Sequence, residues 1–185
     1  MSSFVRRGFC HVYGDHVPLD EGVMAFRFAI QRVNDPKDLI PHLFEVIDPE
    51  FVRRVKPGDF VVAGQDFACG KTHMQGFIAM NALGMSVLCE SMPYKPMRRA
   101  AGEGLPILTG CRGATEFAKT GDEIEVDFTT GAARNLTQGT QTQFPPMPPI
   151  LRDLAVNGGM RGVLAQWLRE HPEQAVEPTS APATT

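Results

Sequence analysis

Residues 56–75 have the sequence KPGDFVVAGQDFACGKTHMQ. The Pro-Gly-Asp near its start predicts a turn, and Phe60–Ala63 has the continuous apolar pattern of a short buried strand. A glycine-containing loop follows, and we expect a helix to begin where Gly70 is followed by Lys71, Thr72 and His73. Unpaired backbone N–H groups and the positive end of the helix dipole favour an anion at such a place. The sequence therefore predicts a site for a carboxylate or a phosphate around Gly70.

The run Gly70-Lys71-Thr72 also resembles the end of a nucleotide-binding P-loop. That motif needs another glycine five residues before Gly70, and the residue there is Gln65. Gly64 lies one position too early, so the spacing argues against a nucleotide site.

Apolar segments on both sides of this loop predict a βαβ unit. We expect a helix from Thr72 to Leu83, buried through residues such as Phe77 and Met80 and ended by Gly84. The short apolar run Met85–Cys89 is typical of a strand that is covered on both faces. The crossover between the two strands should be right-handed.

The other elements are expected from turn residues and apolar periodicity. They are a strand at 8–13, helices at 35–43, from Asp48 and at 96–103, a short strand after Gly104, a strand at 121–128 paired with 136–144, and a helix at 150–171 interrupted by Asn157-Gly158-Gly159. In the last helix we expect Leu164 and Trp167 to pack inward. The tail at 172–185 is rich in Pro, Ala, Thr and Glu, and we expect it to be disordered.

Composition indicates one soluble domain, which we place at residues 1–171. The chain has 185 residues, of which 43% are hydrophobic, enough for one buried core and few for two. A net charge of −3 provides no basic field for nucleic acid, and no apolar run is long enough to cross a membrane. The N-terminus lacks the apolar region of a secretory signal, so we expect a cytoplasmic protein.

The cysteines predict neither a metal site nor disulfides in this chain. Cys10, Cys69, Cys89 and Cys111 are widely scattered, with no C-x-x-C pair and no histidine at ligand spacing. Three of them are expected to be small core residues. Cys69 is the exception because it immediately precedes Gly70.

Several motifs along the chain together carry a family resemblance. They are Gly14-Asp15, Asn34–Leu39, Ile47–Phe51, Gly58–Gly70, Gly104–Ile107 and Asn157–Gly159. In their order and spacing they resemble the small-subunit family of 3-isopropylmalate dehydratase, the separately encoded swivel domain of the aconitase superfamily. The resemblance covers about residues 8–165.

This resemblance implies a single swivelling β/β/α domain of the aconitase C-terminal type, a mixed sheet with flanking helices. It also implies a large-subunit partner that holds a 4Fe–4S cluster, with no cofactor in this chain. The implied activity is that of a hydro-lyase, which removes and re-adds water on isopropylmalate or a related hydroxy di- or tricarboxylic acid. The cluster would act as the Lewis acid, and a swivel-domain side chain would abstract the proton next to a carboxylate.

The loop after Gly70 departs from the family pattern. The family has Gly-Ser-Ser-Arg-Glu-His there, with the first serine as the base and the arginine binding a carboxylate. In this chain Lys71 occupies the position of the serine base, Thr72 that of the second serine and His73 that of the arginine. The resemblance thus makes these three the catalytic candidates. Lys71 could act as a base only if burial or a neighbouring cation lowered its pKa; otherwise it would bind a carboxylate as a cation.

Other departures lie near the expected pocket. The family has an early Asp-Thr-Asp, of which this chain keeps only the second acid, Asp20. The family's following Pro-Ala-Arg is matched poorly, unless a shift of one residue lets Arg27 take the place of its arginine. The predicted substrate-binding residues are Gly70, Cys69, Asp20, Arg27, Arg98 and Arg99. Such changes indicate either a different substrate or a loss of activity.

Each candidate also has a purely structural interpretation. Lys71 and Thr72 could form a solvated turn, His73 could be a structural hydrogen-bonding residue, and Asp20 could cap a turn. Arg98 and Arg99 could simply cover an exposed helix. Three functions therefore stay open: a catalytic partner subunit, a non-catalytic or regulatory swivel protein, and a carboxylate-binding module that works alone.

Overall fold

The computed structural model describes residues 4–174. The strands are β1 Val5–Val12, β2 Phe60–Ala63, β3 Ser86–Cys89, β4 Ile107–Leu108, β5 Glu123–Asp127, β6 Ala132–Asn135 and β7 Thr140–Gln143. The α-helices are α1 Arg27–Ile30, α2 Pro36–Leu39, α3 Phe51–Arg54, α4 Gln75–Ala82, α5 Tyr94–Glu103, α6 Ala114–Phe117, α7 Pro149–Val156 and α8 Gly159–Glu170. Two 3₁₀ turns complete the described elements, η1 Ile40–His42 and η2 Pro172–Gln174.

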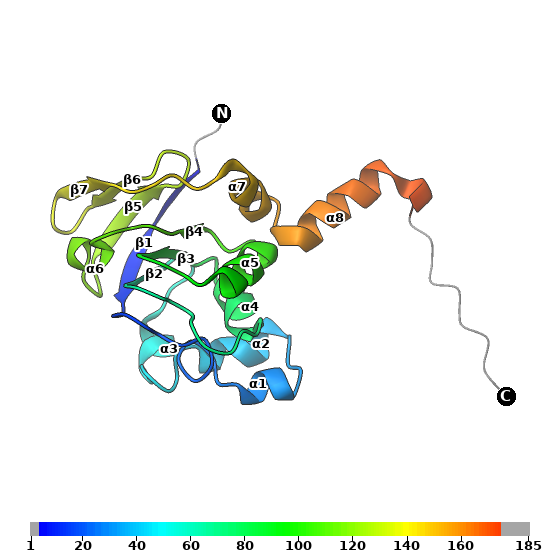
Figure 1. Ribbon diagram of the computed structural model, residues 1–185, viewed down its shortest axis with the longest axis horizontal. Coiled ribbons are helices and arrows are strands. Elements are labelled where there is room, and N and C mark those ends of the chain that lie inside the picture. Colours follow the sequence, from blue (N-terminus) through cyan, green and yellow to red (C-terminus); the bar gives the residue numbers. More distant parts are fainter. Residues whose placement is uncertain (1–3, 175–185) are drawn as a thin grey trace.

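Strand β1 joins a parallel half-sheet to an antiparallel one (Figure 1). Within the described residues the strands form one sheet in the order β4-β3-β2-β1-β5-β6-β7. Strands β1 to β4 are parallel neighbours, with Cys10 opposite Phe60 and Phe60 opposite Ser86. Strand β5 pairs antiparallel with β1, β6 with β5, and β7 with β6. The expected mixed sheet with flanking helices is confirmed.

The central strand β2 is buried on both faces, as its continuous apolar run predicts. Its side chains alternate between two hydrophobic clusters because successive residues of a strand point to opposite faces. Val61 lies in the cluster that contains Leu39 and Phe77 of the helices, whereas Phe60 lies in the cluster that contains Ile124 of β5. The sheet thus has a core on each side, and β2 ends between them at the loop that follows.

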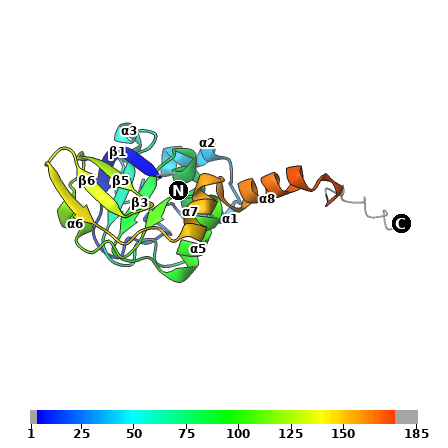
Figure 2. The same ribbon diagram turned by 90° about the horizontal axis from the view of Figure 1, so that it is seen from above.

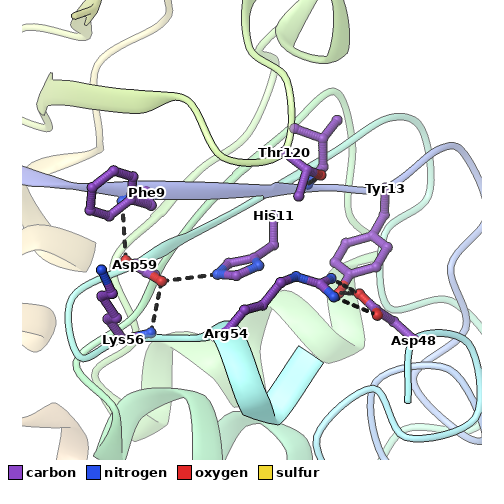
Figure 3. A network of polar contacts seen from close by, with 9 residues as sticks. Phe9, His11, Tyr13, Asp48, Arg54, Lys56, Asp59 and Thr120 are labelled. Atoms are coloured by element: carbon purple, nitrogen blue, oxygen red, sulfur yellow. Dashed lines mark hydrogen bonds and ion pairs between the residues drawn. The ribbon is translucent and has the colours of Figure 1, made fainter. Parts of the chain in front are cut away.

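A buried polar network ties β1 to the turn before β2 (Figure 3). Asp59, only 2% exposed, accepts hydrogen bonds from the backbone N–H groups of Phe9 at 3.1 Å and Lys56 at 2.8 Å. The Nε2 atom of His11, itself 3% exposed, lies 2.9 Å from Asp59 Oδ2. Because an ionised carboxylate only accepts, Nε2 is the nitrogen that carries hydrogen in this contact.

A second part of the network holds α3 against β1. The Tyr13 hydroxyl donates to Asp48 Oδ2 at 2.9 Å, and Arg54 Nη1 donates to Asp48 Oδ1 at 2.9 Å. Burial and the hydrogen bond to Asp48 raise the pKa of Tyr13 above its ordinary range. The phenol is therefore protonated at neutral pH.

The helix expected at 72–83 is present as α4, but its expected start is wrong. Helix α4 begins at Gln75, and residues 70–74 form an irregular segment that continues the loop from β2. Gly70 has φ +82°, a left-handed conformation that cannot continue an α-helix. The end of α4 is as expected, since Gly84 follows it with φ +64°.

The hairpin after β5 was assigned to the wrong segment. Its partner is β6, at Ala132–Asn135, and β7 then pairs with β6, not with β5. Residues of β6 have low strand propensity, but Ala133 and Asn135 are buried in alternation and so fit the sheet. The expected segment 136–144 contains the turn between β6 and β7 in addition to β7.

Several helix boundaries also differ from expectation. The helix expected at 35–43 is present as α2 followed by η1, and the Asp35 side chain caps it by accepting from Lys37 N at 2.9 Å. The helix expected from Asp48 begins at Phe51, and that expected at 96–103 begins at Tyr94. The first residues of the expected disordered tail form η2, and residues 175–185 lie outside the described part.

Helix α8 projects away from the rest of the protein (Figures 1 and 2). The inward packing expected of Leu164 and Trp167 is wrong, since they are 55% and 42% exposed. A tight backbone contact at the start of α8 sets its direction. A Cβ atom on Gly159, whose φ is +76°, would lie 2.3 Å from the carbonyl oxygen of Gly102, and one on Gly104 would lie 2.5 Å from Gly159 N. Only glycine allows the two helices to meet this closely.

No helix within residues 4–174 is long and apolar enough to cross a membrane.

Candidate functional site

A cleft of about 910 Å³ lies where the loop after β2 faces α5 and the first turn of α8. It is lined by Gly70, Lys71, Thr72, Met74, Lys95, Arg98, Arg99, Gly102, Glu103, Met160 and Arg161. Its volume falls in the range of small-molecule sites, roughly 300–1,000 Å³. Segments far apart in the sequence thus meet around a space that a small ligand fits.

The loop that forms one wall has an unusual backbone. Asp66, Ala68 and Gly70 all have positive φ, at +52°, +61° and +82°. Left-handed conformations at non-glycine residues store strain and are concentrated at functional sites. The loop follows the carboxyl end of a parallel strand, which is where ligands bind in open α/β sheets.

The Asp20 carboxylate supports this loop through a hydrogen bond to its backbone. Its Oδ1 atom accepts a hydrogen bond from Lys71 N at 3.0 Å, and a Cβ atom on Gly70 would lie 2.4 Å from the same oxygen. Glycine is therefore needed at position 70 both for its φ and for the approach of Asp20. Asp20 is not among the cleft-lining residues, so the structure gives it a loop-supporting position.

Lys71 and Thr72 line the cleft, although no helix begins there as the anion-site prediction expected. The exposed Lys71 ammonium lies 4.0 Å from the centroid of the Phe26 ring, within the range of a cation–π interaction. This contact orients a long side chain that has no carboxylate partner among residues 4–174. The ammonium can therefore meet an anion without first breaking an ion pair.

Helix α5 presents one basic face to the cleft. Lys95, Arg98, Arg99 and Gly102 follow the spacing i, i+3, i+4 and i+7 and lie on one side of the helix, whereas Pro96, Ala100 and Ala101 are buried on the other. Arg98 also lies over the Tyr94 ring, 5.6 Å from its centroid. Like charges at this spacing destabilise a helix, and an anion bound at this face would relieve their repulsion.

Arg161, from the first turn of α8, completes the basic lining. The five cations that line the cleft form no ion pair with a carboxylate within the described residues, and the one acid beside them is Glu103. Elsewhere, arginines such as Arg7, Arg27 and Arg54 are paired with carboxylates. The cleft is thus strongly positive in a chain whose net charge is −3.

His73 points away from the cleft into the protein. It is 7% exposed, neither ring nitrogen has a hydrogen-bond partner within the described structure, and its ring centroid lies 5.8 Å from that of Phe26. Burial lowers the pKa of His73 below the ordinary value of a histidine, so the ring is neutral at neutral pH. His73 does not line the cleft, and its catalytic role stays a prediction.

We expect His73 to make the protein less stable at acidic pH. Because its folded-state pKa is lowered, the unfolded chain binds the proton more tightly, and the free energy of unfolding falls as the pH drops through the ordinary histidine pKa of about 6.5. Urea unfolding at about pH 7.5 and about pH 5.5 measures this change. In His73→Leu, which keeps the site filled, the difference between the two pH values should be smaller. An equal pH dependence in both proteins would show that His73 does not cause the loss of stability at acidic pH.

Arg27 and Cys69 also lie outside the cleft lining. Arg27 forms an ion pair with Glu45, and its guanidinium lies 4.6 Å from the centroid of the Phe28 ring. The half-buried Cys69 directs its Sγ atom toward the carbonyl oxygen of His16 at 3.6 Å. The proposed shift that would bring Arg27 to the substrate therefore has no support in this geometry.

The structure brings together five of the predicted residues and adds others. Gly70, Lys71, Thr72, Arg98 and Arg99 share the cleft, whereas Cys69, His73, Asp20 and Arg27 do not line it. Sequence reasoning missed Lys95 and Arg161. The helical spacing from Arg98 and Arg99 would have revealed Lys95. No sequence signal indicated Arg161, because α8 reaches the cleft only through the tertiary fold.

The cysteines do not form a metal-binding set. No cluster of three or more His, Cys, Asp or Glu side chains suited to a metal occurs within residues 4–174. Cys10, Cys89 and Cys111 are buried, and burial raises the pKa of Cys10 and of Cys111 to about 12.

Comparison with known proteins identifies the family. The 3-isopropylmalate dehydratase small subunit of Caldicellulosiruptor bescii is 36% identical over 157 residues, which cover 84% of this chain and 92% of that protein. The subunit of the same name from Lachnoclostridium phytofermentans is 37% identical over 154 residues, 83% of this chain and 91% of that protein. This chain belongs to the 3-isopropylmalate dehydratase small-subunit family. The resemblance inferred from the sequence motifs is thereby confirmed, and with it membership of a hydro-lyase family.

The three-dimensional comparison agrees with this family. A crystal structure of 3-isopropylmalate dehydratase from Methanocaldococcus jannaschii matches with a TM-score of 0.80 and 26% identity, covering 93% of this chain and 100% of that one. The expected swivel fold of the small-subunit family is confirmed. A scan against protein-family models finds none that matches.

Proposed function

We propose that this chain is the small subunit of a two-component hydro-lyase that acts on 3-isopropylmalate or a related hydroxy di- or tricarboxylic acid. The observation that carries the proposal is the cleft of unpaired cations in a chain of this family. A carboxylic acid substrate would provide these cations with the negatively charged partners that they do not have within the described residues. With 3-isopropylmalate itself as substrate, the protein would serve leucine biosynthesis.

The cleft residues have distinct proposed roles. Arg98 and Arg99 bind substrate carboxylates, because a guanidinium offers paired N–H donors that match a carboxylate. The Thr72 hydroxyl and the backbone of Gly70 complete the carboxylate site. Lys71 stands beside them and is the candidate for removing the proton next to a carboxylate, a step that needs its neutral amine and leaves the proton on Nζ until water is re-added. As an ammonium it would bind a carboxylate instead.

The large subunit is proposed to supply the iron–sulfur cluster. This chain offers no ligand set for it within the described residues, whereas its family name, that of a small subunit, implies a larger partner. When bound opposite the cleft, the cluster would supply the Lewis acid that polarises the departing hydroxyl. This chain then binds and orients the carboxylates and moves the proton.

Reconstitution tests the proposal. The tagged chain is purified together with its large subunit under anaerobic conditions, and hydration of an alkene diacid is followed by the ultraviolet absorbance of its double bond. We expect turnover from the complex and none from either subunit alone. A tight complex without turnover on any hydroxy acid would favour the non-catalytic alternative. Strong dicarboxylate binding by the isolated chain, seen by calorimetry, would favour the module that works alone.

A further inference from the structure

The cleft holds more positive charge than a dicarboxylate can neutralise. Five cations line it, namely Lys71, Lys95, Arg98, Arg99 and Arg161, against the single acid Glu103. Two substrate carboxylates would leave cations unpaired next to each other, and like charges at close range repel. A ligand with more than two anionic groups fits this lining better.

The cations approach the cleft from three separate elements. Lys71 comes from the strained loop, the Lys95–Arg99 face from α5, and Arg161 from α8. An anion with groups in three directions can contact all three walls at once. The apolar side chains that line the cleft within the described residues are Met74 and Met160, which is little surface for a branched alkyl group.

The position of Arg161 is set by the fold. It lies two residues after Gly159, whose backbone is in close contact with Gly102 and Gly104 at the end of α5. This contact holds the first turn of α8 against α5, although the rest of the helix is exposed. Arg161 is therefore a cation held at the edge of the cleft.

We infer that the preferred substrate carries a third anionic group, as a hydroxy tricarboxylate does, and that Arg161 binds this group. The inference rests on the proposed function for the assignment of the cleft to the substrate. It deepens that function by naming the class of acid and a residue that selects it. Arg161 then distinguishes a tricarboxylate from a dicarboxylate such as 3-isopropylmalate.

Two unreactive acids test this inference without turnover. Tricarballylate and glutarate share the same five-carbon dicarboxylate chain, and tricarballylate has one additional carboxylate at its centre. Calorimetry on the assembled complex should show tricarballylate binding about tenfold to a hundredfold more tightly, the size expected for one charge-assisted contact. Equal affinities would overturn the inference.

Variants on α8 locate the effect. Arg161→Gln should bring the affinity for tricarballylate down to that for glutarate, and Arg161→Lys should restore part of the difference. Arg169→Gln is the matched control, because Arg169 is exposed on the last turn of the same helix and does not line the cleft. A preference that survives in Arg161→Gln, or is lost equally in Arg169→Gln, would overturn the role of Arg161.

The outcome is separable from that of the proposed function. If the complex shows the tricarballylate preference but dehydrates no hydroxy acid, the hydro-lyase proposal fails and the third anionic subsite stands. If it dehydrates 3-isopropylmalate and shows no preference for tricarballylate, the proposed function stands and the third subsite fails.

Discussion

Alanine in place of Lys71 should lower kcat/KM of the assembled enzyme by about two to four orders of magnitude, the usual contribution of a general base. Lys71 lines the cleft, carries no ion pair within the described structure, and is placed by the Asp20 contact and the Phe26 ring. Steady-state kinetics with purified complex measure the change. Size-exclusion chromatography should show that the two subunits still assemble, because Lys71 faces the cleft and not the core.

A charge-preserving variant separates the two possible roles of Lys71. Lys71→Arg keeps the positive charge, but a guanidinium does not lose its proton at neutral pH and cannot act as a base. If Lys71 is the base, Lys71→Arg should be nearly as inactive as Lys71→Ala. If Lys71→Arg keeps most of the activity, Lys71 binds a carboxylate and the base is another group.

The control for both variants is Lys37→Ala. Lys37 is exposed in the first turn of α2 and is not among the cleft residues. Its loss should leave kcat/KM within about twofold of the unchanged protein, as expected for a surface substitution. Unchanged turnover in Lys71→Ala would remove Lys71 from the mechanism.

Asp59→Ala should reduce the free energy of unfolding by about 3 kcal/mol, the upper end of the cost of leaving a buried polar group without its partner. The Asp59 carboxylate accepts from Phe9 N, Lys56 N and the His11 ring, and it is almost fully buried. Its removal leaves three donors without their acceptor at the junction between β1 and β2, and the His11 ring among them is buried (Figure 3). Urea unfolding followed by circular dichroism measures the loss.

Asp38→Ala provides the comparison for Asp59→Ala. Asp38 is exposed near the N-terminus of α2, where it contributes only through the helix dipole. Its substitution should cost less than about 1 kcal/mol. An equally small cost for Asp59→Ala would show that water replaces the buried carboxylate and that the network does not hold the sheet together.

Local sequence patterns were sufficient for the central elements and the family. The apolar runs at β2 and β3 and the glycine after α4 predicted the strands and the helix end that the structure shows. These patterns are reliable because a strand that is buried on both faces must be apolar along its whole length. The ordered motifs predicted the family that the relatives confirm.

Local patterns were insufficient where a contact from elsewhere decides the conformation. The helix expected from Thr72 begins only at Gln75, because the preceding loop is held in a left-handed conformation at Gly70 with Asp20 against it. Strand β6 was missed because its alternating burial comes from its neighbours in the sheet, not from strong strand propensity.

The sequence by itself determined which residues carry charge and how they are spaced along one element, so the basic face of α5 could be read from it. Only the tertiary structure decided which of these charges meet. It buried His73, paired Arg27 with Glu45, and placed Arg161 at the cleft through the glycine contact between α5 and α8. The physical reason is that helical periodicity determines the face of the helix on which a side chain lies. Which residues of other elements that face contacts depends on how closely the backbones pack.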